Sequence, residues 1–175
     1  HPAHDQHHDA GRQARSGGNH QVSEEVEELF HVTYLPIEEL LENCEMISLH
    51  LPVTDLTRNS INDDFFSKMK DQSYLINTAR GELVDTNALI HALKTKKLKM
   101  AGLDTIAGEP VQKDNSLINQ SKEILDKIVF SPHIAGITAS SFKRSYEMTW
   151  IDIQLILNHQ KPTHIVNPWE NEKHD

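Results

Sequence analysis

The segment Leu75-Ile76-Asn77-Thr78-Ala79-Arg80-Gly81-Glu82-Leu83-Val84-Asp85 decides how the chain is expected to fold. With Ser73 and Tyr74 before it, its first half is a short apolar run that predicts a buried strand ending at Arg80 and Gly81. Arg80 therefore falls at the carboxyl end of a predicted parallel strand, where open α/β sheets bind ligands. A guanidinium group is always charged and its fork of donors matches a carboxylate, so the position suits an acidic substrate. The alternative role for this arginine is a surface salt bridge.

Predicted strands and helices alternate on both sides of this segment. Helices are predicted from the spacing of apolar residues and from capping residues, and strands from short apolar runs with breaking residues at their ends. In chain order the predicted elements are a helix from Ser23 to Phe30, a strand at His31–Tyr34, a helix from Pro36 to about Cys44, a strand at Met46–Leu51, a helix at Asn62–Met69, the central strand, a helix capped by Asp85, strands at Met100–Ile106 and Ile128–Ser131, and a long helix from Thr138 to about His159. Repeated alternation of this kind predicts an α/β fold with a parallel sheet.

The composition argues against several classes of protein. The 175 residues are 37% hydrophobic and 25% charged, which is ordinary for one globular domain with a core. A net charge of −9 argues against a nucleic-acid partner, and the basic cluster Lys94–Lys99 is interpreted as the end of a helix. No apolar run reaches the roughly 20 residues of a membrane span. The single Cys44 cannot form an internal disulfide, so a cytoplasmic location is predicted.

Residues 1–21 differ in composition from the rest of the chain. They include five histidines and three glycines but no Leu, Ile, Val or aromatic residue. Such a segment cannot bury enough apolar surface to offset its ordering entropy, so it is predicted to be a disordered tail outside the fold. His4, His7 and His8 could bind a metal, but their spacing matches no closed site and no metal site is predicted.

Four polar residues fall at or just beyond the ends of predicted strands. Arg80 and His133 each follow a strand, Asp104 lies near the end of one, and Glu109 lies a few residues beyond one. Because parallel strands end at the same edge of their sheet, these side chains are expected to converge there. A carboxylate anchor, acidic residues and a histidine together suit an acidic substrate that exchanges a proton. The alternative for His133 is a structural histidine at a strand end.

Several motifs occur in the order that is typical of one family. They are Ser48-Leu49-His50-Leu51-Pro52, Leu75 through Asp85, Ala101-Gly102-Leu103-Asp104 leading to Gly108-Glu109-Pro110, and Ser131-Pro132-His133-Ile134-Ala135-Gly136. With these motifs, residues 22–168 resemble the D-isomer-specific 2-hydroxyacid dehydrogenases. The resemblance implies part of a Rossmann-like, doubly wound parallel sheet with helices on both faces and a long C-terminal helix. Residues 169–175 are then expected to form a flexible tail.

The resemblance also implies an activity and roles for individual residues. The family's NAD-dependent enzymes interconvert a 2-oxo acid and a D-2-hydroxy acid by hydride transfer. Arg80 would bind the substrate carboxylate, His133 would act as acid and base, and Glu109 would pair with His133 and orient it. Cofactor contacts are implied for Leu51, Pro52, Thr57, Thr78, Ala79, Asp104 and Gly136. The expected cofactor is NAD, with NADP left open, and an intact family member is expected to be a homodimer.

The chemistry of this reaction agrees with these residue types. Hydride transfer to a 2-oxo acid builds negative charge on oxygen, which a guanidinium and an imidazolium stabilise. Imidazole titrates near neutral pH, and a neighbouring carboxylate favours its charged form. The hydride has to come from a nicotinamide.

Parts of the family pattern are absent from the sequence. The glycine-rich G-x-G-x-x-G turn that holds the pyrophosphate does not occur anywhere in the chain. The substrate domain and the first two strands of the cofactor domain are also missing. The chain is therefore expected to be a fragment that is inactive alone, with Met46–Leu51 as an exposed apolar edge. Two alternatives stay open: a catalytically inactive remnant or interaction module of the same fold, and a metal-binding histidine tail.

Overall fold

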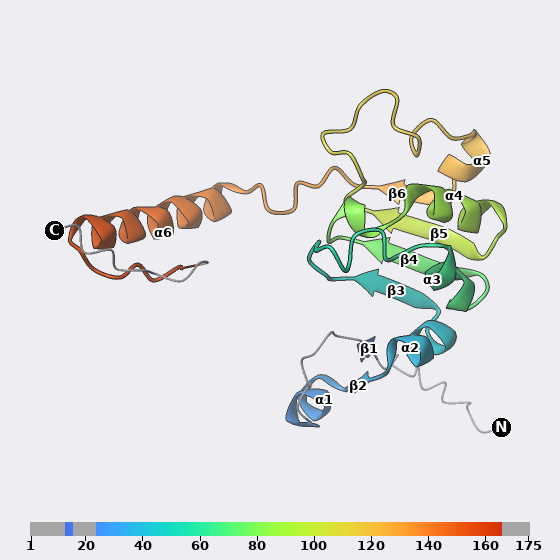
Figure 1. Ribbon diagram of the computed structural model, residues 1–175, viewed down its shortest axis with the longest axis horizontal. Coiled ribbons are helices and arrows are strands. Elements are labelled where there is room, and N and C mark those ends of the chain that lie inside the picture. The colour runs from blue at the N-terminus through green and yellow to red at the C-terminus, as the bar shows by residue number, and fades with distance from the viewer. Residues whose placement is uncertain (1–12, 16–23, 166–175) are drawn as a thin grey trace, which may run out of the picture. The chain divides into compact units, whose positions relative to one another are not determined.

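A computed structural model describes residues 13–15 and 24–165, and the chain divides into two compact units, His1–Pro132 and His133–Asp175 (Figure 1). The helices and strands are, in chain order, β1 (Gln13–Arg15), α1 (Glu24–Phe30), β2 (Val32–Tyr34), α2 (Ile37–Asn43), β3 (Met46–Leu49), α3 (Asp63–Lys68), β4 (Ser73–Asn77), the 3₁₀ helix η1 (Gly81–Leu83), α4 (Thr86–Lys94), β5 (Leu98–Leu103), α5 (Lys122–Leu125), β6 (Ile128–Phe130) and α6 (Ala139–Leu157). All of these elements except α6 belong to the first unit.

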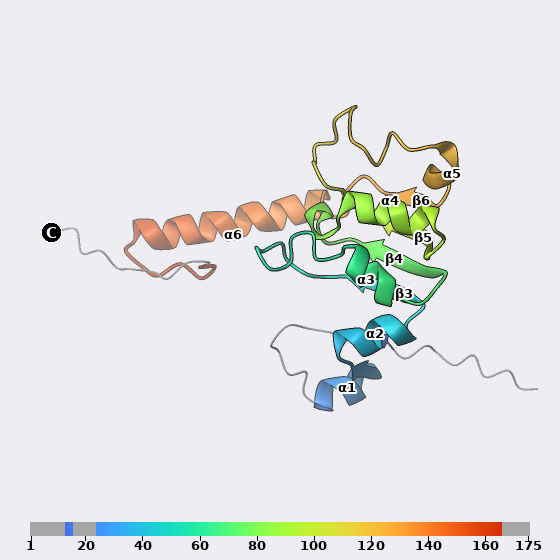
Figure 2. The ribbon, with the colours of Figure 1, turned by 45° about the vertical axis from the view of Figure 1, so that its right-hand side comes forward.

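The first unit contains a sheet of four parallel strands in the order β3-β4-β5-β6. The strands run in the same direction and therefore end at one edge, called here the carboxyl edge. Helices α3 and α4 lie side by side on one face of this sheet (Figures 1 and 2). A second, two-stranded sheet pairs β1 with β2 in parallel. The α/β fold class with a parallel sheet is thus confirmed.

The core lies between the four-stranded sheet and its helices, and apolar spacing accounts for it. Alternate residues of β4 are buried, as expected for a strand with one face against helices. In α4 the buried side chains follow the 3–4 spacing of one helix face. They are Ala88, Leu89, Ile90, Ala92 and Leu93.

Side-chain caps begin the two helices on this face. Asp85 accepts hydrogen bonds through Oδ1 from the backbone N–H groups of Asn87 (2.8 Å) and Ala88 (3.2 Å). Asn62 accepts one from the N–H of Phe65 at 3.2 Å. These bonds satisfy N–H groups that have no partner inside the helix. The predicted cap at Asp85 is confirmed.

The ends of several elements differ from the prediction. Strand β3 ends at Leu49, two residues before the predicted end, and it is an edge strand of its sheet as expected. Strand β5 begins at Leu98 and ends at Leu103. The short helix α5 lies between two predicted strands, where no helix was predicted. Strand ends and one-turn helices depend on hydrogen bonds to distant neighbours, which local patterns do not record.

One strand falls in the segment predicted to be a tail. The three residues of β1 pair with β2, in contrast with the expectation that residues 1–21 take no part in the fold. The remaining tail residues, with His4, His7 and His8 among them, lie outside the described residues. Residues 166–175 lie outside them too.

The second unit is built on α6. Its first turn has a capping box, in which Thr138 Oγ1 accepts from the N–H of Ser141 at 3.0 Å and Ser141 Oγ accepts from the N–H of Thr138 at 3.1 Å. The helix buries none of its residues, and Trp150 is 62% exposed. Asp152 lies within α6, and its carboxylate accepts a hydrogen bond at 2.8 Å from the N–H of Thr163, which follows the helix. This bond holds the following segment against α6.

Candidate functional site

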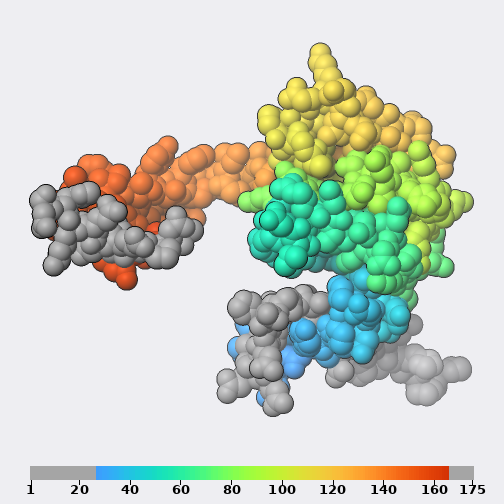
Figure 3. Space-filling model, in the orientation of Figure 1, coloured from blue at the N-terminus to red at the C-terminus, as the bar shows by residue number. Residues whose placement is uncertain are grey.

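Three connections leave the carboxyl edge of the sheet: residues 50–62 after β3, residues 78–85 after β4 and residues 104–127 after β5. Backbone hydrogen bonds join the first two, from Asn59 N to Glu82 O (2.9 Å) and from Ile61 N to Leu83 O (3.0 Å). In the space-filling view, the teal, light-green and yellow atoms of these regions form one continuous surface (Figure 3). The carboxyl edge therefore carries a connected set of loops.

Arg80 lies on the connection after β4, where the sequence predicted it. Its backbone is extended (φ −145°, ψ 140°) and its side chain is exposed. The side chain of Asn77, at the end of β4, accepts a hydrogen bond from Ala79 N (3.0 Å) and donates one to Arg80 O (2.8 Å). Arg80 Nη1 in turn donates to Ala79 O at 2.7 Å. A buried amide thus holds the turn that presents the guanidinium at the surface.

Gly81 brings the connection after β5 against this turn. A Cβ atom added to Gly81 would lie 1.9 Å from the carbonyl carbon of Ile106 and 2.3 Å from the nitrogen of Ala107. Because both of these are backbone atoms, no side chain can be accommodated here without moving one of the loops. The glycine next to Arg80 therefore permits close contact between the two connections.

Asp104 and Glu109 lie on the second of these connections. Asp104 directly follows β5, its N–H donates to Asn77 O at 2.9 Å, and its carboxylate accepts a hydrogen bond from the hydroxyl of Ser131. Glu109 Oε1 accepts one from Ile106 N at 2.9 Å. Because the backbone of Ile106 also packs on Gly81, the loop that carries Glu109 lies beside the turn that carries Arg80.

The other predicted cofactor residues of the first unit also lie at the carboxyl edge. Thr78 is exposed and Ala79 is half-buried, both in the turn after β4. Leu51 and Pro52 are exposed in the connection after β3. Thr57 lies in the same connection, and its hydroxyl donates a hydrogen bond to Pro52 O at 2.7 Å.

His133 and Gly136 belong to the second unit, His133–Asp175. His133 is exposed, and its backbone lies in the left-handed region with φ at 52°. The structure thus brings together the loops of Arg80, Asp104 and Glu109 within the first unit. His133 and Gly136 belong to the second unit.

Sequence reasoning missed Asn77, Gly81 and Ser131 as parts of this edge. A signal was present for Asn77, because an amide at a buried strand position needs hydrogen-bond partners. Gly81 follows the arginine directly, but nothing in the local pattern indicates which backbone packs on it. The bond from Ser131 to Asp104 joins residues 27 apart in the chain, so only the strand order brings them together.

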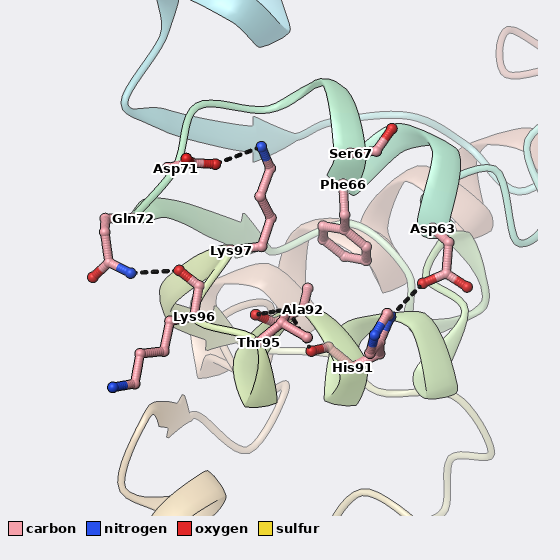
Figure 4. A pocket seen from close by; sticks show the side chains of 10 residues that line it. All are labelled: Asp63, Phe66, Ser67, Asp71, Gln72, His91, Ala92, Thr95, Lys96 and Lys97. Atoms are coloured by element: carbon pink, nitrogen blue, oxygen red, sulfur yellow. Dashed lines mark hydrogen bonds and ion pairs between the residues drawn. The ribbon is translucent and has the colours of Figure 1, made fainter.

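A groove of about 680 Å³ lies away from these residues, between α3 and α4 (Figure 4). Two ion pairs join its walls, His91 Nδ1 to Asp63 Oδ1 at 3.1 Å and Lys97 Nζ to Asp71 Oδ1 at 2.7 Å. Its lining residues are Asp63, Phe66, Ser67, Asp71, Gln72, His91, Ala92, Thr95, Lys96 and Lys97. None of the predicted site residues is among them, so the groove is separate from the candidate site.

Within residues 13–15 and 24–165, no three His, Cys, Asp or Glu side chains gather in a way that could hold a metal ion. Over the same ranges no helix has the length and apolar character needed to cross a bilayer.

The fold and the edge residues define an α/β domain of the kind that binds ligands at the carboxyl edge of a parallel sheet. Residues 15–135, more than half of the chain, match the family described as D-isomer specific 2-hydroxyacid dehydrogenase, NAD binding domain. The chain therefore belongs to this family, and the resemblance inferred from its motifs is confirmed.

Individual relatives agree with the family. The chain is 37% identical over 147 residues to the dehydrogenase efuE of Hormonema carpetanum, covering 83% of this chain and 35% of that protein. It is 34% identical over 144 residues to a glyoxylate reductase of Korarchaeum cryptofilum, covering 82% and 42%. The crystal structure of D-lactate dehydrogenase with NAD⁺ from Lactobacillus jensenii superposes with a TM-score of 0.74 at 32% identity, covering 90% and 48%. The chain thus spans between about a third and a half of the length of these relatives.

Proposed function

We propose that this chain is part of an NAD-dependent oxidoreductase that interconverts a small 2-oxo acid and the corresponding D-2-hydroxy acid. The observation that carries the proposal is the exposed Arg80 at the carboxyl edge, beside the loop of Glu109, in a domain of this family. The glyoxylate reductase and D-lactate dehydrogenase relatives make a short 2-oxo acid the substrate class to test first. A homodimer and a cytoplasmic location stay predictions.

Arg80 is proposed to bind the substrate carboxylate. Its guanidinium is exposed, while its backbone is held by Asn77 and by the contact at Gly81. A fork of donors with a fixed base can hold a carboxylate through two hydrogen bonds and keep the neighbouring oxo group in a constant orientation. The same positive charge stabilises the negative charge that develops on the oxo oxygen.

His133 is proposed to act as acid and base, with Glu109 as the residue that orients it. An imidazolium can protonate the oxo oxygen in one direction, and the imidazole can take the proton back in the other. The Glu109 carboxylate is anchored by its hydrogen bond from Ile106 N at 2.9 Å.

The residues present fit one end of an NAD molecule. Thr78, Leu51 and Pro52 are exposed at the carboxyl edge, where they can contact the nicotinamide and its ribose. The sequence has no glycine-rich turn for the pyrophosphate. When bound, the nicotinamide supplies or accepts the hydride.

The substitution Arg80→Lys in the full-length protein tests the role of the arginine. Lysine keeps the charge but loses the planar fork, so turnover of 2-oxo acids should fall by about 10²–10³. NADH affinity should stay nearly unchanged. Arg144→Lys, at an exposed position of α6, is the matched control and should leave both quantities unchanged. An equal loss of NADH affinity in Arg80→Lys would make Arg80 a structural residue instead.

The 175-residue chain alone is a second test. We expect no measurable NADH binding and no hydride transfer, because the sequence supplies no turn for the pyrophosphate. The purified chain is titrated with NADH by fluorescence and assayed with pyruvate, hydroxypyruvate and 2-oxoisocaproate, with Arg80→Ala as control. Saturable binding at micromolar NADH, or turnover above that control, would contradict the expectation.

An inactive remnant or interaction module of the same fold is the second candidate. The observation in its favour is the missing glycine-rich turn, which removes the main anion site of a dinucleotide-binding domain. A full-length protein that neither binds NADH nor converts a 2-oxo acid would support this candidate.

A further inference from the structure

Asn77 stands out among the buried residues of the first unit. It is 0% exposed, and only two other polar residues are buried among those described, Ser73 at 1% and Thr105 at 2%. The hydroxyl groups of Ser73 and Thr105 have no hydrogen-bond partner within the described structure. The side-chain amide of Asn77, in contrast, uses both its oxygen and its nitrogen.

The side-chain amide and the backbone oxygen of Asn77 bond to residues of the candidate site. Its Nδ2 donates to Arg80 O at 2.8 Å, and its Oδ1 accepts from Ala79 N at 3.0 Å. Its backbone oxygen accepts from Asp104 N at 2.9 Å. One buried residue thus ties the turn that carries Arg80 to the first residue of the connection after β5.

The position of the guanidinium depends on this turn. Arg80 is a long exposed side chain, and Nη1 donates to Ala79 O at 2.7 Å. The N–H of the same Ala79 is held by Asn77, and so is the carbonyl of Arg80 itself. If the amide of Asn77 were lost, the N–H of Ala79 would lose this acceptor, and the carbonyl of Arg80 would keep only its longer bond from Leu83 N at 3.3 Å.

We propose that Asn77 is a positioning residue that holds Arg80 in place for the substrate carboxylate. The proposal rests on the proposed role of Arg80. Asn77 acts through the backbone of Ala79 and Arg80 and does not contact the substrate. Its loss should weaken the binding of the substrate carboxylate more than it weakens NADH affinity, because Ala79 is also an expected cofactor contact.

Asn77→Asp is the informative substitution. An ionised aspartate has the same shape and keeps an oxygen that accepts from Ala79 N, but it has no donor for Arg80 O. The turn is then held on one side only, and an ionised carboxylate would face the carbonyl of Arg80. A displacement of about 1 Å in a substrate-binding group can lower kcat/KM by about 10²-fold, which is the size of effect expected here. Oxamate, an analogue of a 2-oxo acid, should bind more weakly by a comparable factor.

The test is a double-mutant cycle in the full-length protein, with Asn77→Asp, Arg80→Ala and the double variant. Oxamate affinity, NADH affinity and kcat/KM for pyruvate and glyoxylate are measured for each. If Asn77 acts through Arg80, Asn77→Asp causes no further loss once Arg80 is alanine. Ser73→Ala, a buried polar position at the other end of β4, is the matched control and should leave all three quantities unchanged.

Each outcome of the cycle has a separate meaning. Unchanged oxamate affinity and kcat/KM in Asn77→Asp, or losses that add fully to those of Arg80→Ala, would overturn the proposal. Equal oxamate affinity and equal kcat/KM in wild type and Arg80→Ala would instead contradict the proposed function. If Asn77→Asp does not fold, Asn77→Ser takes its place in the same cycle, because its short hydroxyl cannot span both backbone groups.

Discussion

Helices α4 and α6 use the same kind of apolar spacing with opposite results. In α4 the apolar face is buried against the sheet, and Leu93 is 0% exposed. In α6 no residue is buried, and Leu157 is 68% exposed. Periodicity thus predicts a helix and its apolar face, but not whether that face is covered. The stability of α6 within its own unit has to come from local interactions, whereas α4 shares the core of the sheet.

The stability of α6 can be traced to contacts along the helix. Its first turn is closed by the capping box of Thr138 and Ser141. Phe142 and Tyr146 stack with ring centroids 6.5 Å apart, and Lys143 pairs with Glu147 at 3.8 Å. Pairs at this spacing stabilise an isolated helix by roughly 0.2–0.5 kcal/mol each. We expect the two regions to respond very differently to equivalent substitutions.

The largest contrast is expected for core truncation. Leu75→Ala removes a side chain that is 0% exposed and should destabilise the first unit by about 2–5 kcal/mol. Trp150→Ala, at a 62% exposed position of α6, should change the stability by less than about 0.5 kcal/mol. Unfolding in urea, monitored by amide hydrogen exchange, measures the stability of the two regions separately. A large effect of Trp150→Ala would show that the apolar face of α6 is covered in the protein.

Two glycines extend the contrast to backbone packing. Gly81→Ala places a Cβ atom 1.9 Å from the backbone of Ile106 and should destabilise the first unit by about 1–3 kcal/mol. Gly136→Ala meets no atom within 4 Å and should leave the stability unchanged. Thermal unfolding of both variants checks this pair. Equal melting temperatures would mean that the connection after β5 can move away from Gly81 at little cost.

The helix caps should separate global from local stability. Asp85→Ala removes the acceptor for two N–H groups of α4 and should lower the stability of the whole first unit by about 1 kcal/mol. Thr138→Ala should lower the helicity at the start of α6 and leave the unfolding of the first unit unchanged. Amide hydrogen exchange along both helices measures this. Faster amide exchange in the sheet of the first unit after Thr138→Ala would contradict the expectation that this substitution acts only on α6.

The smallest effect concerns the end of α6 and depends on pH. The hydrogen bond from the N–H of Thr163, with further bonds from its hydroxyl and from His164, lowers the pKa of Asp152 from 3.8 to about 2. Because the folded pKa lies below the unfolded one, the contribution to stability is present above pH 3.8 and is lost as the pH falls towards 2. The amide signal of Thr163 in a pH titration by NMR should report this loss. Asp152→Asn should abolish the transition, and a transition that persists in that variant would assign it to another group.

Much of the fold could be predicted because it depends on local chemistry. Each predicted feature depends on residues that are close together in the sequence. Examples are the alternate burial in β4, the 3–4 spacing of α4 and the cap at Asp85. The same holds for the placement of Arg80 and Asp104 just after strands, since a run of apolar residues ends where the strand ends. The family could be identified from the sequence for the same reason, because its motifs are short segments in a constant order.

The tertiary structure alone decided which of these segments meet. Three contacts join residues at or beyond the ends of different strands. They are the packing of Gly81 on Ile106, the bond from Asp104 to Asn77 and the bond from Ser131 to Asp104. Local patterns record which side of an element is buried, but contacts between distant segments depend on strand order and register. The sequence by itself therefore determined the elements and the residue types of the candidate site. The parallel pairing of β4 with β5 brings the carboxyl ends of both strands to one edge. Only this pairing accounts for the hydrogen bonds of Asn77 to the neighbouring segments and for the contact between the loops of Arg80 and Glu109.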